Sequence, residues 1–160
     1  MVKLSKLTDY GLLLMSCFAR GERQKLHTAR DLAAESNLPL PTVSKLLKEL
    51  LQSGLLVSHR GIKGGYSLAK AAHQISLAEI IAALEGPVAL TECSSDVSGV
   101  CDLEACCTIK RNQQVISRAV RGVLEKLTLS DLTQPLQLTA IKGVEGNLIP
   151  TVGLVSRRTQ

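Results

Sequence analysis

The stretch Pro41-Thr-Val-Ser-Lys-Leu-Leu-Lys-Glu-Leu-Leu-Gln-Ser53 has the pattern of an amphipathic helix and decides the fold. Pro41 suits the first position of this helix, and Gly54 suits its end. The residues that its inner face would bury are Val43, Leu46, Leu47 and Leu50. Upstream, Thr28 can cap a shorter helix that ends near Asn37, and only a short linker separates the two helices. Two short helices joined by a tight turn predict a helix-turn-helix.

In a helix-turn-helix, the second helix enters the major groove of DNA and points its N-terminal residues toward the base edges. The outward polar residues at this end are the candidates for base contact, namely Thr42, Ser44, Lys45 and Lys48. An ordinary solvated helix face would have the same composition. The helix alone leaves both interpretations open.

A β-hairpin is predicted directly after this helix. Leu55-Leu-Val-Ser-His59 and Tyr66-Ser-Leu68 are strand-like, and the turn between them, Arg60-Gly-Ile-Lys-Gly-Gly65, is glycine-rich and basic. Arg60 and Lys63 can reach phosphates or a minor groove from this turn. The turn lacks the Lys-Ser/Thr ending of a P-loop, which disfavours an enzymatic phosphate loop. The fold class is therefore mainly α with a small β wing, a winged helix-turn-helix domain followed by further helices.

The charge of the chain is concentrated in its first half. Residues 1–70 carry 11 Lys/Arg and 5 Asp/Glu, a net +6, whereas residues 71–160 carry 8 and 9, a net −1. This distribution favours nucleic acid binding by the N-terminal half. With one Phe, two Tyr and no Trp, stacking on single-stranded bases is disfavoured, so double-stranded DNA is the expected partner.

Two further helices are predicted in the second half. Ser76-Leu-Ala-Glu79 is a capping box that opens a helix through Leu84, and Gly86-Pro87 closes it. A longer helix follows, with an apolar face formed by Ile109, Ile116, Val120, Val123 and Leu127. Its other side carries Lys110, Arg111, Arg118 and Arg121. This helix could pack on its own domain, but its place outside the winged helix favours a homodimer interface.

These patterns divide the chain into three segments. We expect residues 1–70 to form the winged helix-turn-helix domain and residues 71–133 the cysteine loop and dimerisation helices. Residues 134–160 are predicted to be a flexible tail, and their Val, Leu and Ile content leaves a docking segment as the alternative. At 160 residues, the chain can bury a core without structural disulfides.

The first residues could pass for an export signal, but Asp9 interrupts the approach to a short apolar run. A helix whose apolar face carries Tyr10, Leu13, Leu14, Cys17 and Phe18 is favoured instead, with Cys17 as a small core residue. No stretch is long enough to span a bilayer. We expect a cytoplasmic protein that does not engage a membrane and whose thiols stay reduced.

Four of the five cysteines lie in one short acidic segment, at Cys93, Cys101, Cys106 and Cys107. Acidic neighbours disfavour a free thiolate, so a metal-free cysteine of low pKa is not what this setting favours. A bound metal reverses that effect, because its positive charge stabilises coordinated thiolates. The segment therefore predicts a metal site.

Taken together, the motifs resemble the bacterial IscR/NsrR family of iron–sulfur transcription regulators. The matching features are the wing Arg60-Gly-Ile-Lys-Gly-Gly-Tyr66, the helix capped by Ser76, the clustered cysteines and a long helix ending Leu124-Glu-Lys-Leu-Thr-Leu-Ser-Asp-Leu132. The resemblance covers residues 1–133 and is closest to the branch that controls the SUF cluster-assembly system. It implies a homodimeric repressor of cluster-assembly genes, with a 2Fe–2S cluster favoured and a 4Fe–4S cluster as the alternative.

The resemblance also implies a ligand set. Cys93, Cys101 and Cys107 match three thiolate ligands, and Cys106 is an extra thiol. Lys110 stands where some relatives have a histidine ligand, and a protonated lysine is a poor ligand. In other relatives the fourth ligand is a carboxylate from the first helix of the partner subunit. Asp9 matches that position and is the first candidate, with Cys106 the second; an ordinary N-terminal helix acid is the competing interpretation of Asp9.

For DNA, the resemblance places Arg60 in a minor groove, with Lys63 and Tyr66 in the same DNA-binding wing. Ser44 occupies the position of a base-reading glutamate found in some relatives, so the preferred operator sequence is open. The three histidines, His27, His59 and His73, match no ligand position and are predicted to be surface residues.

Two alternatives compete with the cluster-sensing function. Thiolates suit a structural zinc ion as well as iron, and Cys106–Cys107 or Cys101 could form a disulfide in a metal-free thiol switch. An enzyme is the least favoured class, because no nucleophile–base pair or cofactor fingerprint is present.

Overall fold

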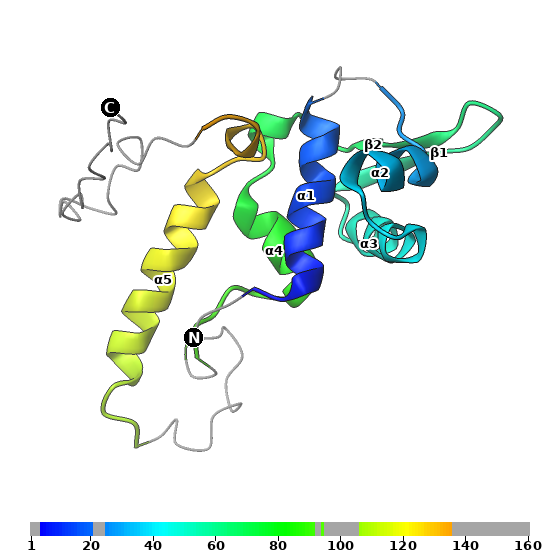
Figure 1. The fold of residues 1–160 in the computed structure, drawn as a ribbon. Coiled ribbons are helices and arrows are strands. Elements are labelled where there is room, and N and C mark those ends of the chain that lie inside the picture. The colour runs from blue at the N-terminus through cyan, green and yellow to red at the C-terminus, as the bar shows by residue number, and fades with distance from the viewer. Residues whose placement is uncertain (1–3, 21–24, 92–93, 95–105, 136–160) are drawn as a thin grey trace, which may run out of the picture.

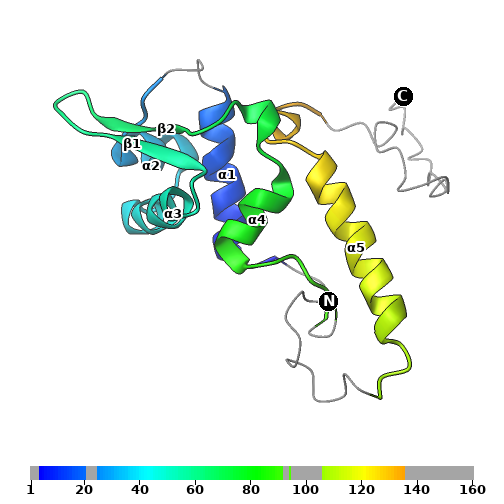
Figure 2. The ribbon, with the colours of Figure 1, turned by 180° about the vertical axis from the view of Figure 1, so that it is seen from behind.

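A computed structural model describes residues 4–20, 25–91, 94 and 106–135. Helix α1 runs through the middle of the molecule, with the helix-turn-helix and the hairpin on one side and α4 and α5 on the other (Figure 1). The view from behind shows the same arrangement (Figure 2). The elements are α1 (Lys6–Arg20), α2 (Ala29–Ser36), α3 (Leu40–Gln52), β1 (Leu56–His59), β2 (Gly65–Leu68), η1 (Ala72–Gln74), α4 (Leu77–Glu85), α5 (Lys110–Lys126) and η3 (Asp131–Thr133). The predicted fold class, mainly α with a two-stranded wing, is confirmed.

The helix-turn-helix forms where the sequence predicts it. A reciprocal capping box between Thr28 and Asp31 starts α2, and Asn37 ends it in the left-handed conformation with φ of 54°. Helix α3 begins at Leu40, one residue before the predicted start, so that Pro41 lies in its first turn. Gly54 follows α3 with φ of 75°, a conformation that favours glycine.

The wing is an antiparallel hairpin anchored to a third segment. Its register pairs Leu56 with Leu68 and His59 with Gly65. The backbone of His27 pairs with the outer side of β2: its N–H donates to the Tyr66 carbonyl at 3.0 Å, and its carbonyl accepts from the Tyr66 N–H at 2.8 Å. A Cβ atom on Gly65 would lie 2.8 Å from the His27 carbonyl oxygen. Because Gly65 has no side chain, the backbone of His27 can lie close to β2 and hold the base of the wing.

The core is aliphatic and is centred on α1. The largest fully buried side chains in the described residues include Leu14 and Met15 of α1, Leu46 of α3, Ile80 of α4 and Leu129. Cys17 is buried, as predicted, and burial raises the pKa of its thiol. The predicted apolar face of this helix is wrong at Leu13, which is 40% exposed. Helix α1 packs against α2, α3, α4 and η3. Its buried face therefore includes Met15, and Leu13 faces solvent.

Helix α1 is closely approached by its neighbours at Gly11. A Cβ atom there would lie 2.2 Å from Cδ1 of Leu84 in α4 and 3.5 Å from Cδ2 of Leu46 in α3. Gly11 is buried, so the backbone of α1 itself forms part of the packing surface. Helices α3 and α4 therefore meet α1 at the same place.

A polar contact holds the start of α1 to the end of α4. The Glu85 carboxylate accepts hydrogen bonds from the Ser5 backbone N–H and, at 2.6 Å, from the Thr8 hydroxyl. These hydrogen bonds, first of all that from Thr8, lower the pKa of Glu85. Thr8 is fully buried. The negative charge also lies at the positive end of the α1 dipole, and we call this contact the Glu85 clamp.

Helix α5 is attached to the rest of the molecule through both ends of α4. At the start of α4, the Leu77 N–H donates to the Leu127 carbonyl at 2.9 Å; after α4, the Leu90 N–H donates to the Ser117 hydroxyl at 3.3 Å. Leu124 and Leu127 pack against the core. Other apolar residues of the predicted face remain exposed, namely Ile109, Ile116 and Val120. The apolar face of α5 is thus divided between the core and solvent.

No helix among the described residues is long and apolar enough to cross a membrane. Cys93, Cys101 and nearly all of the predicted tail lie outside the described residues.

We expect Glu85→Gln to lower the free energy of unfolding at pH 7 by about 0.5–1 kcal/mol, because a neutral amide is a weaker acceptor than a carboxylate. The folded-state pKa is depressed below its ordinary value of 4.5. The stabilisation is therefore present above that value and is lost as the pH falls through the lower folded-state pKa. Chemical denaturation of both proteins between pH 3 and pH 7 measures this difference.

A matched control is Glu125→Gln on α5. Glu125 pairs with Arg121 at 3.3 Å on the surface, so its loss should change stability by less than about 0.5 kcal/mol. A difference between wild type and Glu85→Gln that persists unchanged at pH 3 would contradict the clamp.

Candidate nucleic-acid interface and cysteine segment

The outer face of α3 carries the residues predicted to contact bases. Ser44, Lys45 and Lys48 are exposed and Thr42 is half-buried, while the opposite face of the helix fills the core. Lys45 lies 3.9 Å from Glu49, one turn further on, and its side chain is still 62% exposed. Such a surface pair is weak and leaves the ammonium group able to meet a phosphate.

The wing presents its two cations at the end of a constrained loop. Arg60 and Lys63 are exposed. Gly61 has φ of 115°, and a Cβ atom on Gly64 would lie 2.3 Å from the His59 carbonyl oxygen. The Gly64 N–H donates to the Gly61 carbonyl at 2.9 Å. The glycines therefore define the conformation of the loop.

Tyr66 and Ser67 form the base of this loop on β2. The Tyr66 side chain is half-buried, and its backbone is held by His27. The Ser67 hydroxyl forms a 3.0 Å hydrogen bond with Nε2 of His59 on β1. These bonds fix the base of the wing from both sides.

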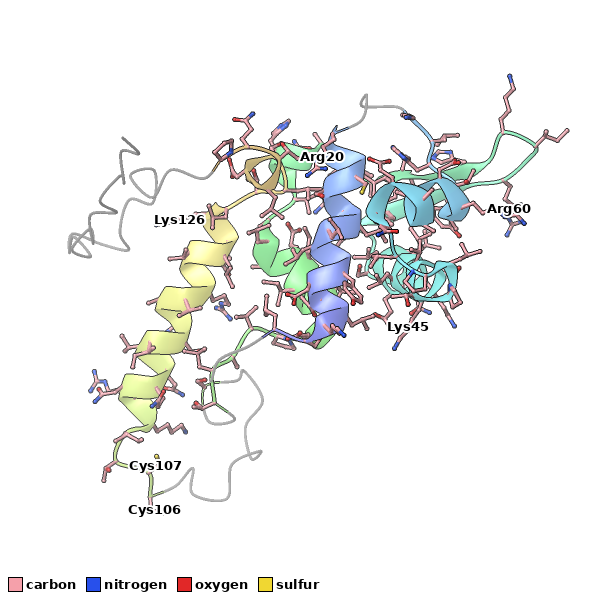
Figure 3. All side chains as sticks on the ribbon, viewed as in Figure 1. Arg20, Lys45, Arg60, Cys106, Cys107 and Lys126 are labelled. Atoms are coloured by element: carbon pink, nitrogen blue, oxygen red, sulfur yellow. The ribbon has the colours of Figure 1, made fainter. Side chains whose placement is uncertain are left out.

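The charged residues of the wing are all cationic. No Asp or Glu occurs between residues 50 and 78. Figure 3 shows Lys45 and Arg60 on the side of the molecule away from α5, whereas Cys106 and Cys107 lie at the far end, next to the start of α5. The structure therefore separates Lys45 and Arg60 from Cys106 and Cys107.

His27 corrects one prediction from the sequence. It was predicted to lie at the surface, but it is only 3% exposed. Its ring packs edge-on against Phe18, with centroids 5.1 Å apart, and its Nδ1 lies 4.0 Å from a Glu35 carboxylate oxygen. Burial lowers the pKa of His27, because desolvation disfavours its charged form. His59 and His73 are exposed, as predicted.

The described part of the cysteine segment leads directly into α5. Cys106 is exposed and Cys107 is half-buried, and the Lys110 N–H donates to the Cys107 carbonyl at 3.4 Å. The described residues contain no group of three side chains that could hold a metal ion. The accessible thiols of Cys106 and Cys107 are better placed to bind a metal than the buried thiol of Cys17. Asp9, the predicted partner-subunit ligand, is exposed in the first turn of α1.

Sequence reasoning missed several residues that shape these regions. Glu85 and Thr8 are 77 positions apart, so no local pattern joins them. Gly65 was recognised as a turn glycine, but its contact with His27 was not predicted. Ile62 lies in the basic turn, where an isoleucine among turn glycines is an unusual choice.

Comparison with known proteins identifies the family. Residues 4–135 match the Rrf2 family model, described as an iron-dependent transcriptional regulator. The chain is similar to the HTH-type transcriptional regulator NsrR of Oceanobacillus iheyensis, with 32% identity over 148 residues, which cover 90% of this chain and 99% of that relative.

Solved structures support the same assignment. CymR (YrzC), the global cysteine regulator of B. subtilis, is 30% identical with a TM-score of 0.64, covering 83% of this chain and 97% of that one. T. potens IscR is 26% identical with a TM-score of 0.63, covering 82% and 85%. The chain therefore belongs to the Rrf2 family of winged-helix transcriptional regulators, which bind DNA and are not enzymes.

Proposed function

We propose that this regulator senses an iron–sulfur cluster and, as a cytoplasmic homodimer, represses iron–sulfur cluster assembly genes in response to the state of that cluster. The observation that carries the proposal is the separation of a cationic reading surface from surface thiols, together with their connection through α1 and α4. Helix α1 is held to α4 by the Glu85 clamp and by packing of Leu84 near Gly11. Leu46 of α3 packs at the same place on α1.

The DNA-binding part of the proposal uses residues 1–70. Helix α3 enters the major groove and presents four residues to the operator, namely Thr42, Ser44, Lys45 and Lys48. The wing reaches the adjacent backbone and minor groove through Arg60 and Lys63, with Tyr66 at its base. The exposure of the cations and the absence of acids between residues 50 and 78 support this assignment.

The sensing part of the proposal uses the cysteine segment. Cys93, Cys101 and Cys107 hold the cluster, with the partner subunit's Asp9 as the fourth ligand and Cys106 as the alternative. Thiolate donors suit both a 2Fe–2S and a 4Fe–4S cluster, and the partial exposure of Cys107 fits such a donor. When bound, the cluster supplies a redox-active group that restricts the conformation of the segment.

Dimerisation follows from the uncovered apolar residues of α5. Ile109, Ile116 and Val120 recur at helical spacing and are at least 37% exposed. A second copy of α5 would bury them, as expected for a two-fold symmetric protein that binds two half-sites.

Coupling between the two parts runs through the first turn of α1. Asp9 follows Thr8, which the Glu85 clamp holds, and α1 packs against α3, which carries the proposed DNA-reading residues. Restraining Asp9 would favour one position of α1 relative to α3. A ligand shifts an equilibrium only through such a difference in its interactions with the two states.

Anaerobic purification followed by absorption spectroscopy and metal analysis tests the sensing function. We expect iron with sulfide-to-iron charge-transfer bands, and we expect Cys107→Ala to lose them. Cys17→Ala is the matched control: it removes a buried core thiol and should keep the bands. Colourless protein with stoichiometric zinc would support a structural zinc site, and colourless metal-free protein would support the thiol switch; either result contradicts the proposal.

The role of the wing is tested with Arg60→Ala. Because a phosphate contact releases counterions, we expect weaker binding and a plot of log affinity against log salt that is shallower by about one unit. The probe is an operator duplex selected by the wild-type protein from a random-sequence pool, and binding is followed by fluorescence anisotropy. Arg118→Ala on α5, which removes an exposed arginine away from the wing, should leave both quantities unchanged.

A further inference from the structure

The apex of the wing carries an isoleucine that none of the described residues covers. Ile62 has a relative exposure of 107%, the highest among the exposed large hydrophobic residues of the described structure. The hairpin loop that carries it projects beyond α2 in both views of the fold (Figures 1 and 2). Single exposed apolar residues are common on protein surfaces, so exposure alone decides nothing.

The local chemistry makes this position unusual. Tight loops favour Gly, Asn, Asp, Ser or Pro, each for a conformational or hydrogen-bonding reason, and a β-branched residue offers neither. The Gly64-to-Gly61 hydrogen bond and the glycines at those positions already set the turn. A polar residue at position 62 would therefore serve the loop conformation equally well.

The surroundings point to one kind of partner. Arg60 and Lys63 flank Ile62, both exposed, and the hairpin contains no acidic residue. A cationic protrusion with an apolar tip fits the minor groove of duplex DNA, where phosphates line the two edges and the sugars and base edges form the floor. Proteins that bind this groove commonly insert an Ile, Leu, Phe, Met or Pro side chain, which widens the groove or kinks the duplex.

We propose that Ile62 enters the minor groove of the operator as an apolar wedge, while Arg60 and Lys63 contact the phosphates on either side. This inference rests on the proposed function of the wing and adds a determinant of specificity. Insertion costs less at flexible base steps than at stiff ones. The protein would therefore discriminate sequences under the wing by their deformability, without hydrogen bonds to the bases.

The predicted signature of a wedge differs from that of a cation. Ile62→Ala should weaken binding to the selected operator duplex about tenfold at every salt concentration, equivalent to about 1.4 kcal/mol, with an unchanged salt slope. Ile62→Leu keeps the apolar volume and should bind within about twofold of wild type. A bend measured by energy transfer between dyes at the two duplex ends should decrease in Ile62→Ala and be kept in Ile62→Leu.

The outcomes separate this inference from the function on which it rests. Ile62→Ala binding within twofold of wild type, with Arg60→Ala weakened, would overturn the wedge and leave the DNA-binding wing intact. If neither variant changes affinity or salt slope, the wing assignment fails as well. Equal loss of affinity in Ile62→Ala and Ile62→Leu would also overturn the wedge, because both variants keep the loop glycines and all charges. Thermal melts of each variant check that the fold is unchanged.

Discussion

Helices α3 and α4 both pack closely against the backbone of α1, and this packing positions the helix-turn-helix relative to the second half of the molecule. A side chain at Gly11 would meet Leu84 at 2.2 Å and Leu46 at 3.5 Å. Because interiors are densely packed, a shift of α1 against either neighbour must be accommodated by the other. Helix α1 therefore packs against both α3, the second helix of the helix-turn-helix, and α4, which precedes the cysteine segment in the chain.

Other contacts make this shared helix a structural junction. The Glu85 clamp fixes the start of α1 to the end of α4, and Phe18 near its other end packs against His27, which holds the root of the wing. The first turn of α1 thus contacts α4, which precedes the cysteine segment. Its last turn contacts His27, which supports the wing. Under the proposed function, a change at Asp9 would reach the helix-turn-helix and the wing through these packed contacts.

The features that were predictable from the sequence are the local ones. The helix cap at Thr28, the capping box at Ser76 and the glycine-rich turn each encode their structure within a few residues, and all three form as expected. The features that were missed depend on packing between distant segments. The burial of His27 follows from pairing with a strand 39 positions later, and the exposure of Leu13 follows from which helices surround α1. The ligand set of the cysteines stays a prediction, because Cys93 and Cys101 lie outside the described residues.

The most direct test of the account is to compare operator affinity between cluster-loaded and cluster-free protein. Both forms would be prepared anaerobically from one purification and titrated against the same selected duplex at one salt concentration. If the cluster biases the position of α1, the two dissociation constants should differ by about fivefold or more, the usual range for allosteric coupling. Equal dissociation constants for the two forms, with the cluster intact in one throughout the titration, would contradict the claim that cluster state controls DNA binding.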